Sequence, residues 1–219
     1  FLPLLLKYFQ RNKDQVKELD LFKLFGYYAV VGLVAFAGFL PFLSPEFISN
    51  FATSLGLWFQ KFEFNASIYY VVRWVGYEMK GYNIIESAGK WLPVVVILII
   101  AGLSFLRKNN SLQQLITTML FGITAYLFFA TTVHPWYLIT PLFLSVFTPY
   151  RFVIVWSFLV ILSYYAYSNP EFQENLWLVA GEYAVVIGCF VYEIRRGLKG
   201  KALGDYFQVK TFSEEEKSI

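Results

Sequence analysis

The chain has 219 residues, of which 58% are hydrophobic, 21% aromatic and only 15% charged. This apolar content is too high for one soluble core of this size, so the composition excludes a soluble globular domain and predicts a polytopic membrane protein. The net charge of +3 does not indicate a nucleic-acid partner, because the basic residues fall in loops that flank apolar runs.

The N-terminal residues 2–6 are apolar and run straight into a polar stretch. A secretory signal has its charges before the apolar run, so we expect this segment to be the end of a transmembrane helix that begins upstream of Phe1. Six further segments are long or apolar enough to be predicted as membrane spans, given the roughly 20 residues that the hydrocarbon core requires. They are residues 22–43, 90–107, 113–132, 136–149, 150–168 and 176–194.

The segment between the first two of these spans, residues 44–89, is too long for a simple turn. Every fourth residue from Phe47 to Phe59 is apolar, which is typical of a helix lying in the membrane interface. Asn65 is expected to cap a second helix with an apolar face. We therefore predict two amphipathic helices between these two spans, both on one side of the membrane.

The loops alternate in charge along the chain, and the positive-inside rule gives their orientation. It places residues 44–89, the turn at His134 and the turn at residues 169–170 on the outer face. Residues 1–198 are thus predicted to form one all-α transmembrane helical bundle with interfacial helices on its outer face. Residues 199–219 are predicted to be a cytoplasmic tail.

His134 is the only histidine of the chain and lies where one apolar run ends and the next begins. Imidazole titrates near neutral pH and exchanges protons or hydrogen bonds with phosphate oxygens, which indicates a binding or catalytic site. The alternative is a turn residue that bonds a backbone carbonyl before Pro135. The neighbouring Trp136 and Tyr137 fit either a sugar-stacking platform or the aromatic belt of the membrane interface.

Arg73 is the preferred ligand for a lipid phosphate, because guanidinium binds phosphate in a bidentate fork. Lys61 precedes the same predicted helix and adds positive charge. The alternative for Arg73 is to reach toward lipid headgroups or to pair with Glu78. Glu182 falls inside the last predicted span, where a carboxylate is costly unless it is paired or faces a wet cavity. It is either part of a site or a structural hydrogen-bond partner of a tyrosine on another helix.

The sequence contains no phosphate-binding loop, dinucleotide fingerprint, HExxH motif or GxSxG elbow. Cys189 is the only cysteine and lies in an apolar segment, so neither a disulfide framework nor a thiolate metal site is predicted. We predict no metal site and no cofactor from these residues.

Two segments have a further meaning when they are taken together: residues 61–70, KFEFNASIYY, and residues 133–138, VHPWYL. They resemble the F-N-x-S-hydrophobic-Y and H-P-W-Y segments of bacterial polyprenyl-phosphate-sugar-dependent glycosyltransferases of the GT-C type, in particular the mannosyltransferase-like branch. The resemblance consists of these short motifs and of the topology over about residues 1–195.

The resemblance implies a hexosyltransferase of a bacterial inner membrane, with its active face periplasmic or extracellular. It would transfer a sugar, mannose above all, from a polyprenyl-phosphate donor to a glycan or lipid acceptor. The family's general base is a carboxylate in the first outer loop, which implies a base upstream of Phe1 and a chain that is the C-terminal part of the enzyme. The resemblance carries Asn65, His134, Trp136 and Tyr137 over as site-lining residues, and His134 is a possible proton donor or hydrogen-bond donor to the departing phosphate.

Two other readings remain open from the residues alone. In a lipid or solute transporter or flippase, Glu182 and the kinked span 136–149 would line a pathway, with broken helices near the midplane. In a non-catalytic membrane subunit, the aromatic residues of the outer face would form a protein contact. An acidic pair in an upstream outer loop would favour the transferase over both.

Overall fold

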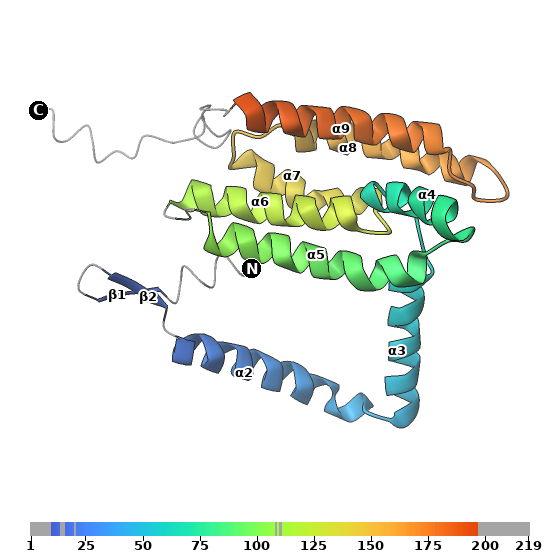
Figure 1. Ribbon diagram of the computed structural model, residues 1–219. Helices are drawn as coiled ribbons and strands as arrows, with labels where there is room; N and C mark the ends of the chain where they lie inside the picture. Colours follow the sequence, from blue (N-terminus) through green and yellow to red (C-terminus); the bar gives the residue numbers. More distant parts are fainter. Residues whose placement is uncertain (1–9, 14–15, 20, 108, 110, 197–219) are drawn as a thin grey trace, which may run out of the picture.

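The structure is a computed structural model that describes residues 10–13, 16–19, 21–107, 109 and 111–196. It is a helical bundle, which confirms the predicted all-α class (Figure 1). A short antiparallel hairpin that the sequence did not predict, β1 (Gln10–Lys13) with β2 (Val16–Leu19), precedes the helices. The predicted helix end at residues 2–6 and the predicted tail 199–219 lie outside the described residues.

The helices follow the predicted segments closely along the chain. They are α2 (Leu21–Phe39), α3 (Pro45–Gln60), α4 (Ile68–Lys80), α5 (Ile85–Phe105), α6 (Leu112–Phe129), α7 (Ile139–Val146), α8 (Phe152–Leu159) and α9 (Leu176–Arg196), with 3-10 turns η1 (Leu40–Phe42), η2 (Pro135–Leu138) and η3 (Val160–Ser168). Both predicted outer helices are present as α3 and α4. Ser44 caps α3 by accepting a hydrogen bond from the Phe47 backbone N–H at 3.0 Å.

Four helices of the described chain are long and apolar enough to cross a membrane, so the protein is a membrane protein. They are Phe22–Phe42, Ile85–Phe105, Leu112–Phe129 and Leu176–Arg196. The predicted spans 136–149 and 150–168 are shorter apolar helices, Pro135–Val146 and Phe152–Ser168. The proline of the span predicted to be kinked, Pro141, lies in the first turn of α7, where no backbone N–H donor is needed.

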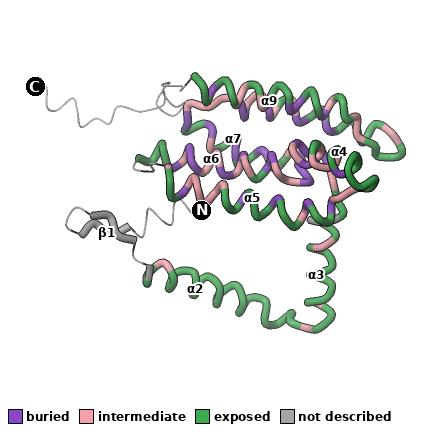
Figure 2. Tube along the Cα trace, in the orientation of Figure 1, coloured by how far each residue is buried: buried purple, intermediate pink, exposed green. Residues whose placement is uncertain are grey.

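The core of the bundle lies between α6, α8 and α9, where Leu120, Phe152, Trp156 and Val186 are fully buried. In contrast, α2 lies apart from the bundle, none of its residues 22–39 is buried, and α3 links it to α5 (Figures 1 and 2). The turn between α7 and α8 and the C-terminal end of α9 lie at one end of the bundle, and α3, α4 and the loops at 130–134 and 169–175 lie at the other. We call this second end the outer end.

At the opposite end, the Glu193 side chain of α9 caps the N-terminus of helix α8. Its carboxylate accepts hydrogen bonds from the backbone N–H groups of Arg151, at 3.0 Å to each oxygen, and of Phe152, at 3.2 Å. The first N–H groups of a helix have no partner within the helix, and a carboxylate also interacts favourably with the helix dipole. The Arg151 guanidinium meanwhile donates to the Thr148 carbonyl at 2.7 Å, just after α7 ends. One residue pair therefore defines the turn between α7 and α8.

Candidate functional site

The two motif segments of the sequence lie side by side at the outer end. The Phe64 N–H donates to the Thr131 carbonyl at 3.0 Å, and the Val133 N–H donates to the Phe64 carbonyl at 2.8 Å, which makes a parallel bridge. The Thr132 hydroxyl also donates to the Phe62 carbonyl at 3.2 Å. Residues separated by about seventy positions thus form one backbone unit.

Asn65, directly after this bridge, is fully buried and has a positive φ of 46°. Only glycine adopts this left-handed region easily, although asparagine tolerates it better than most residues. Three contacts hold it there. Its N–H donates to Glu174 Oε1 at 2.6 Å, its side-chain amide donates to Glu182 Oε1 at 3.2 Å, and its carbonyl accepts from the Tyr183 hydroxyl at 2.7 Å.

The prediction that Asn65 caps the second outer helix is wrong. The residue before α4 is Ser67, which makes no side-chain capping bond, and the Asn65 side chain points instead to Glu182 of α9. A partner 117 positions away competes successfully with the local backbone, because a buried amide must find a hydrogen bond.

Glu182 is fully buried inside α9. One of the two interpretations of the sequence expected it to bond a tyrosine on another helix, but its partners are an asparagine and a tryptophan. Its Oε1 accepts from Asn65 Nδ2 and from the Trp156 indole N–H at 3.0 Å. Its second oxygen, Oε2, and Asn65 Oδ1 have no hydrogen-bond partner within the described part of the chain. The Glu182 carboxyl is therefore only half satisfied.

Glu174, in the loop before α9, is the next residue of this network. It accepts from the Asn65 N–H and from the Tyr70 hydroxyl of α4. Burial raises the pKa of Glu174 above its ordinary value, and the two hydrogen bonds only partly oppose that effect. Burial likewise raises the pKa of Tyr70, so its hydroxyl stays a donor to the carboxylate. Asn65 and Tyr70 together hold this carboxylate at the outer end.

Glu63 is the centre of a second network beside the first. The Arg73 guanidinium forms an ion pair with Glu63, and the Tyr69 hydroxyl donates to Glu63 at 2.5 Å and lies 2.9 Å from Asn83 Oδ1. Arg73 also lies over the Tyr70 ring, 4.3 Å from its centre. The alternative pairing of Arg73 with Glu78 is not found, and Glu63 takes its place.

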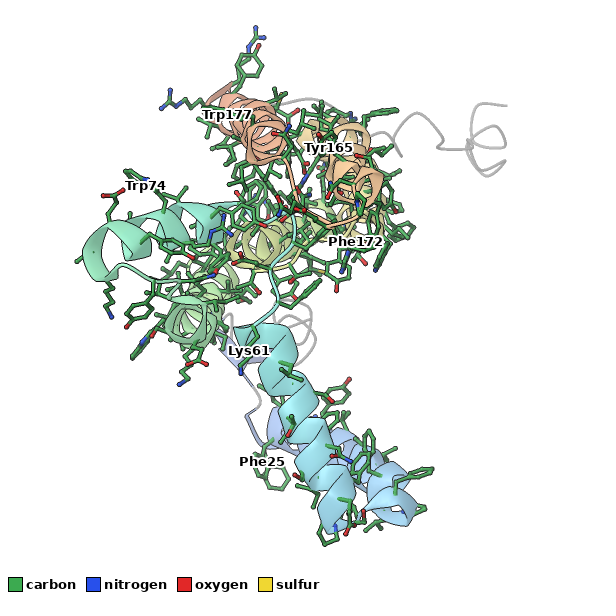
Figure 3. The ribbon with its side chains drawn as sticks, turned by 90° about the vertical axis from the view of Figure 1, so that its right-hand side faces the viewer. Phe25, Lys61, Trp74, Tyr165, Phe172 and Trp177 are labelled. Atoms are coloured by element: carbon green, nitrogen blue, oxygen red, sulfur yellow. The ribbon has the colours of Figure 1, made fainter. Side chains whose placement is uncertain are left out.

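A pocket of about 530 Å³ opens between these networks. We call it the acidic pocket; it is lined by Glu63, Arg73, Gln173 and Glu174 on its polar side and by Phe62, Phe64, Tyr167 and Phe172 on its aromatic side. Figure 3 looks onto the outer end of the bundle and shows Tyr165 and Phe172 on one side of it and Trp74 on the other. The pocket offers two carboxylates, one guanidinium and several aromatic rings to one ligand.

Arg73 and Leu176 also line a larger cavity of about 800 Å³ between α4 and α9, which we call the α4/α9 groove. Its other lining residues include Val71, Trp74 and Val179. Two cavities of different character, one acidic and one mainly apolar, therefore meet at one arginine.

His134 lies behind the acidic pocket and does not line it. Its ring is stacked between Phe64, at a centre-to-centre distance of 4.9 Å, and Trp136, at 4.4 Å, and the Tyr137 ring meets it edge-on. Burial lowers the pKa of His134, so the neutral ring is favoured. Phe64 separates His134 from the acidic pocket, because it stacks on the imidazole and also lines that pocket.

The predicted site residues therefore fall into three groups. Asn65, Arg73 and Glu182 belong to the linked networks at the acidic pocket. His134, Trp136 and Tyr137 form the aromatic stack on the far side of Phe64. Lys61 is exposed where α3 joins the bundle and lines neither the acidic pocket nor the α4/α9 groove (Figure 3).

Glu63, Glu174 and Tyr70 were not predicted as site residues. Glu63 lies within the KFEFNASIYY segment, so the motif itself was the available signal. Glu174 comes from a loop more than one hundred positions away and has no local signal. Only the tertiary fold, in which the Asn65 N–H and the Tyr70 hydroxyl donate to its carboxylate, brings it to the site.

Within the residues that the structure describes, no three histidine, cysteine, aspartate or glutamate side chains are grouped as metal ligands. Comparison of the chain with protein-family models, curated proteins and solved structures finds no significant match.

Proposed function

We propose that the protein is a membrane glycosyltransferase that moves a sugar from a polyprenyl-phosphate donor to an acceptor at the outer end of the bundle. The observation that carries this proposal is the acidic pocket, where Glu63, Glu174 and Arg73 face a set of aromatic rings. The resemblance of the two motif segments supplies the GT-C class, mannose as the sugar and the bacterial inner membrane with its periplasmic or extracellular face.

The lining of the acidic pocket suits a sugar bound to phosphate. Carboxylates accept hydrogen bonds from sugar hydroxyl groups, and such charge-assisted bonds are stronger than neutral ones. The aromatic side offers apolar ring faces to the sugar ring, and Arg73 offers N–H donors to phosphate oxygens. The two motif segments that carry the resemblance are hydrogen bonded to each other beside this pocket, which is what a shared role in one site requires.

The test is a transfer assay on the whole protein in lipid nanodiscs with polyprenyl-phosphate-mannose. We expect Glu63→Gln and Glu174→Gln each to lower kcat/KM by about 100-fold, since a lost hydrogen bond to a charged group costs about 1.5–3 kcal/mol. Arg73→Ala is expected to do the same. The matched control is Glu78→Gln, because Glu78 is an exposed glutamate of α4, the helix that carries Arg73.

His134→Ala at matched expression separates the pocket from the stack behind it. We expect a smaller loss of transfer than in the pocket variants, because His134 does not line the pocket and contacts Phe62 and Phe64, which do. Undiminished transfer in both carboxylate variants, or no transfer from any polyprenyl-phosphate hexose, would contradict the proposal.

A further inference from the structure

The α4/α9 groove continues inward from the acidic pocket. It is lined on α4 by Val71, Trp74 and Tyr77 and on α9 by residues from Leu176 to Ile187. The eleven steps of about 1.5 Å between these two residues span roughly 16 Å, which is about half of the hydrocarbon core. Because α9 is long and apolar enough to cross the membrane, the groove runs from the outer end toward the middle of the bilayer.

Arg73 is the only charged residue among the lining residues of this groove. It lies at the junction, since it also lines the acidic pocket. One terminal nitrogen of its guanidinium donates to Glu63, and guanidinium carries five N–H donors in all. A ligand with an apolar chain, one phosphate and a polar head would match the groove, the arginine and the pocket in that order.

A second apolar cavity system, on the other side of the bundle, differs from this groove in the charge of its lining. Cavities of about 290 Å³ and 320 Å³ lie between α5, α6 and the η2–α7 segment and share Ile100 and Tyr126. Neither has a charged residue in its lining. Membrane lipids can fill any apolar groove, but of these three cavities in the described part of the chain, the α4/α9 groove alone combines an apolar lining with a cation at its outer end.

We infer that the α4/α9 groove binds the hydrocarbon chain of a polyprenyl-phosphate lipid, with the phosphate at Arg73 and the attached sugar in the acidic pocket. This inference rests on the proposed function for the identity of the lipid. It assigns the chain to the side of the bundle formed by α4 and α9, away from the aromatic stack of His134. The cavity volume lies within the range of about 300–1,000 Å³ that is usual for ligand sites.

The test is photo-crosslinking of the whole protein in phosphatidylcholine nanodiscs with a polyprenyl phosphate that carries a diazirine in its chain. Peptide mapping is expected to place the crosslinks on α4 and α9, and unlabelled polyprenyl phosphate is expected to compete at least ten-fold better than polyprenol. Ala180→Phe and Ala184→Phe fill the groove from exposed positions and are each expected to lower the crosslink yield about ten-fold. Arg73→Gln is expected to remove the preference for phosphate over the alcohol.

The matched control is Ile97→Phe, which places the same side chain at an exposed position of the 290 Å³ cavity beside α5 and α6. It is expected to leave the crosslink yield and the preference for phosphate unchanged. Crosslinks on α5 and α6, equal competition by polyprenol, or an undiminished yield in both groove variants would overturn the inference. Crosslinking on α4 and α9 without sugar transfer would support the groove and refute the transferase. Transfer with crosslinks elsewhere would do the reverse.

Discussion

Two glutamates of α9, Glu182 and Glu193, lie on the same face of the helix, because eleven residues make about three turns. Both are buried, yet they are used differently. Both oxygens of Glu193 accept from backbone N–H groups at the start of α8. Glu182 uses one oxygen for two side-chain donors and leaves the other without a partner among the described residues. The depth of an acid in a span therefore does not indicate its role, whereas its hydrogen-bond partners do.

The largest effect on both stability and transfer is expected when Glu182 is replaced. In Glu182→Ala, the Asn65 amide and the Trp156 indole lose their acceptor, and unsatisfied buried donors cost about 1–3 kcal/mol each. We expect a loss of about 3 kcal/mol in stability and a loss of about 100-fold in transfer, as Asn65 no longer holds Glu174. Unfolding in detergent and the transfer assay measure the two effects.

Glu182→Gln is the control that tells a positioning role from a role of the charge. Its amide oxygen can still accept from Asn65 and Trp156, so both stability and transfer are expected to recover to within a few-fold of the wild type. A glutamine variant that is stable but inactive would show that the carboxylate itself takes part in the reaction.

Glu193→Ala is expected to have the second largest effect, and on stability alone. Loss of a capping side chain costs about 0.5–2 kcal/mol, and here the backbone N–H groups of Arg151 and Phe152 lose their acceptor. Thermal unfolding should show a lower midpoint, while transfer at a temperature where the variant is folded stays at the wild-type level. Lost transfer at unchanged stability would remove the distinction between the two glutamates.

The smallest expected effect on stability concerns the protonation of Glu174, the carboxylate that Asn65 links to Glu182. Because burial raises the pKa of Glu174 above 4.5, the folded state binds the proton more tightly than the unfolded state. The Glu174 contribution to stability therefore falls as the pH rises from about 4.5 through the raised pKa. Glu174→Gln lacks this titration, so its unfolding midpoint relative to the wild type is expected to rise over that interval. A constant difference between pH 4 and 8 would contradict the raised pKa.

The sequence was sufficient for the long helices and the two outer helices, though not for the β1–β2 hairpin, because membrane helices depend on apolar length and local periodicity. The positions of α3, α4 and the four long helices follow from those two quantities. The site depends on side chains that only tertiary packing brings together. Asn65 carries an ordinary capping signal, and its actual partner on α9 cannot be read from its neighbours.

The partner of Arg73 shows the same limit at shorter range. Glu78 is five positions away, whereas helical neighbours that face each other are three or four apart. The spacing thus already disfavoured that pair. Glu63 lies before α4 and reaches Arg73 only because the bridge between Phe64 and Thr132 fixes the path of the chain.

The separate position of α2 has a consequence for how the protein tolerates different membranes. A span that packs on a bundle has its depth set by its neighbours, but residues 22–39 of α2 are not buried, and the helix is joined to the bundle through α3. Membranes differ in thickness by a few ångströms, and an unpacked helix adapts by tilting at modest cost. Tilting of α2 in a thinner or thicker bilayer would thus leave the packing of the described bundle around Asn65 unchanged.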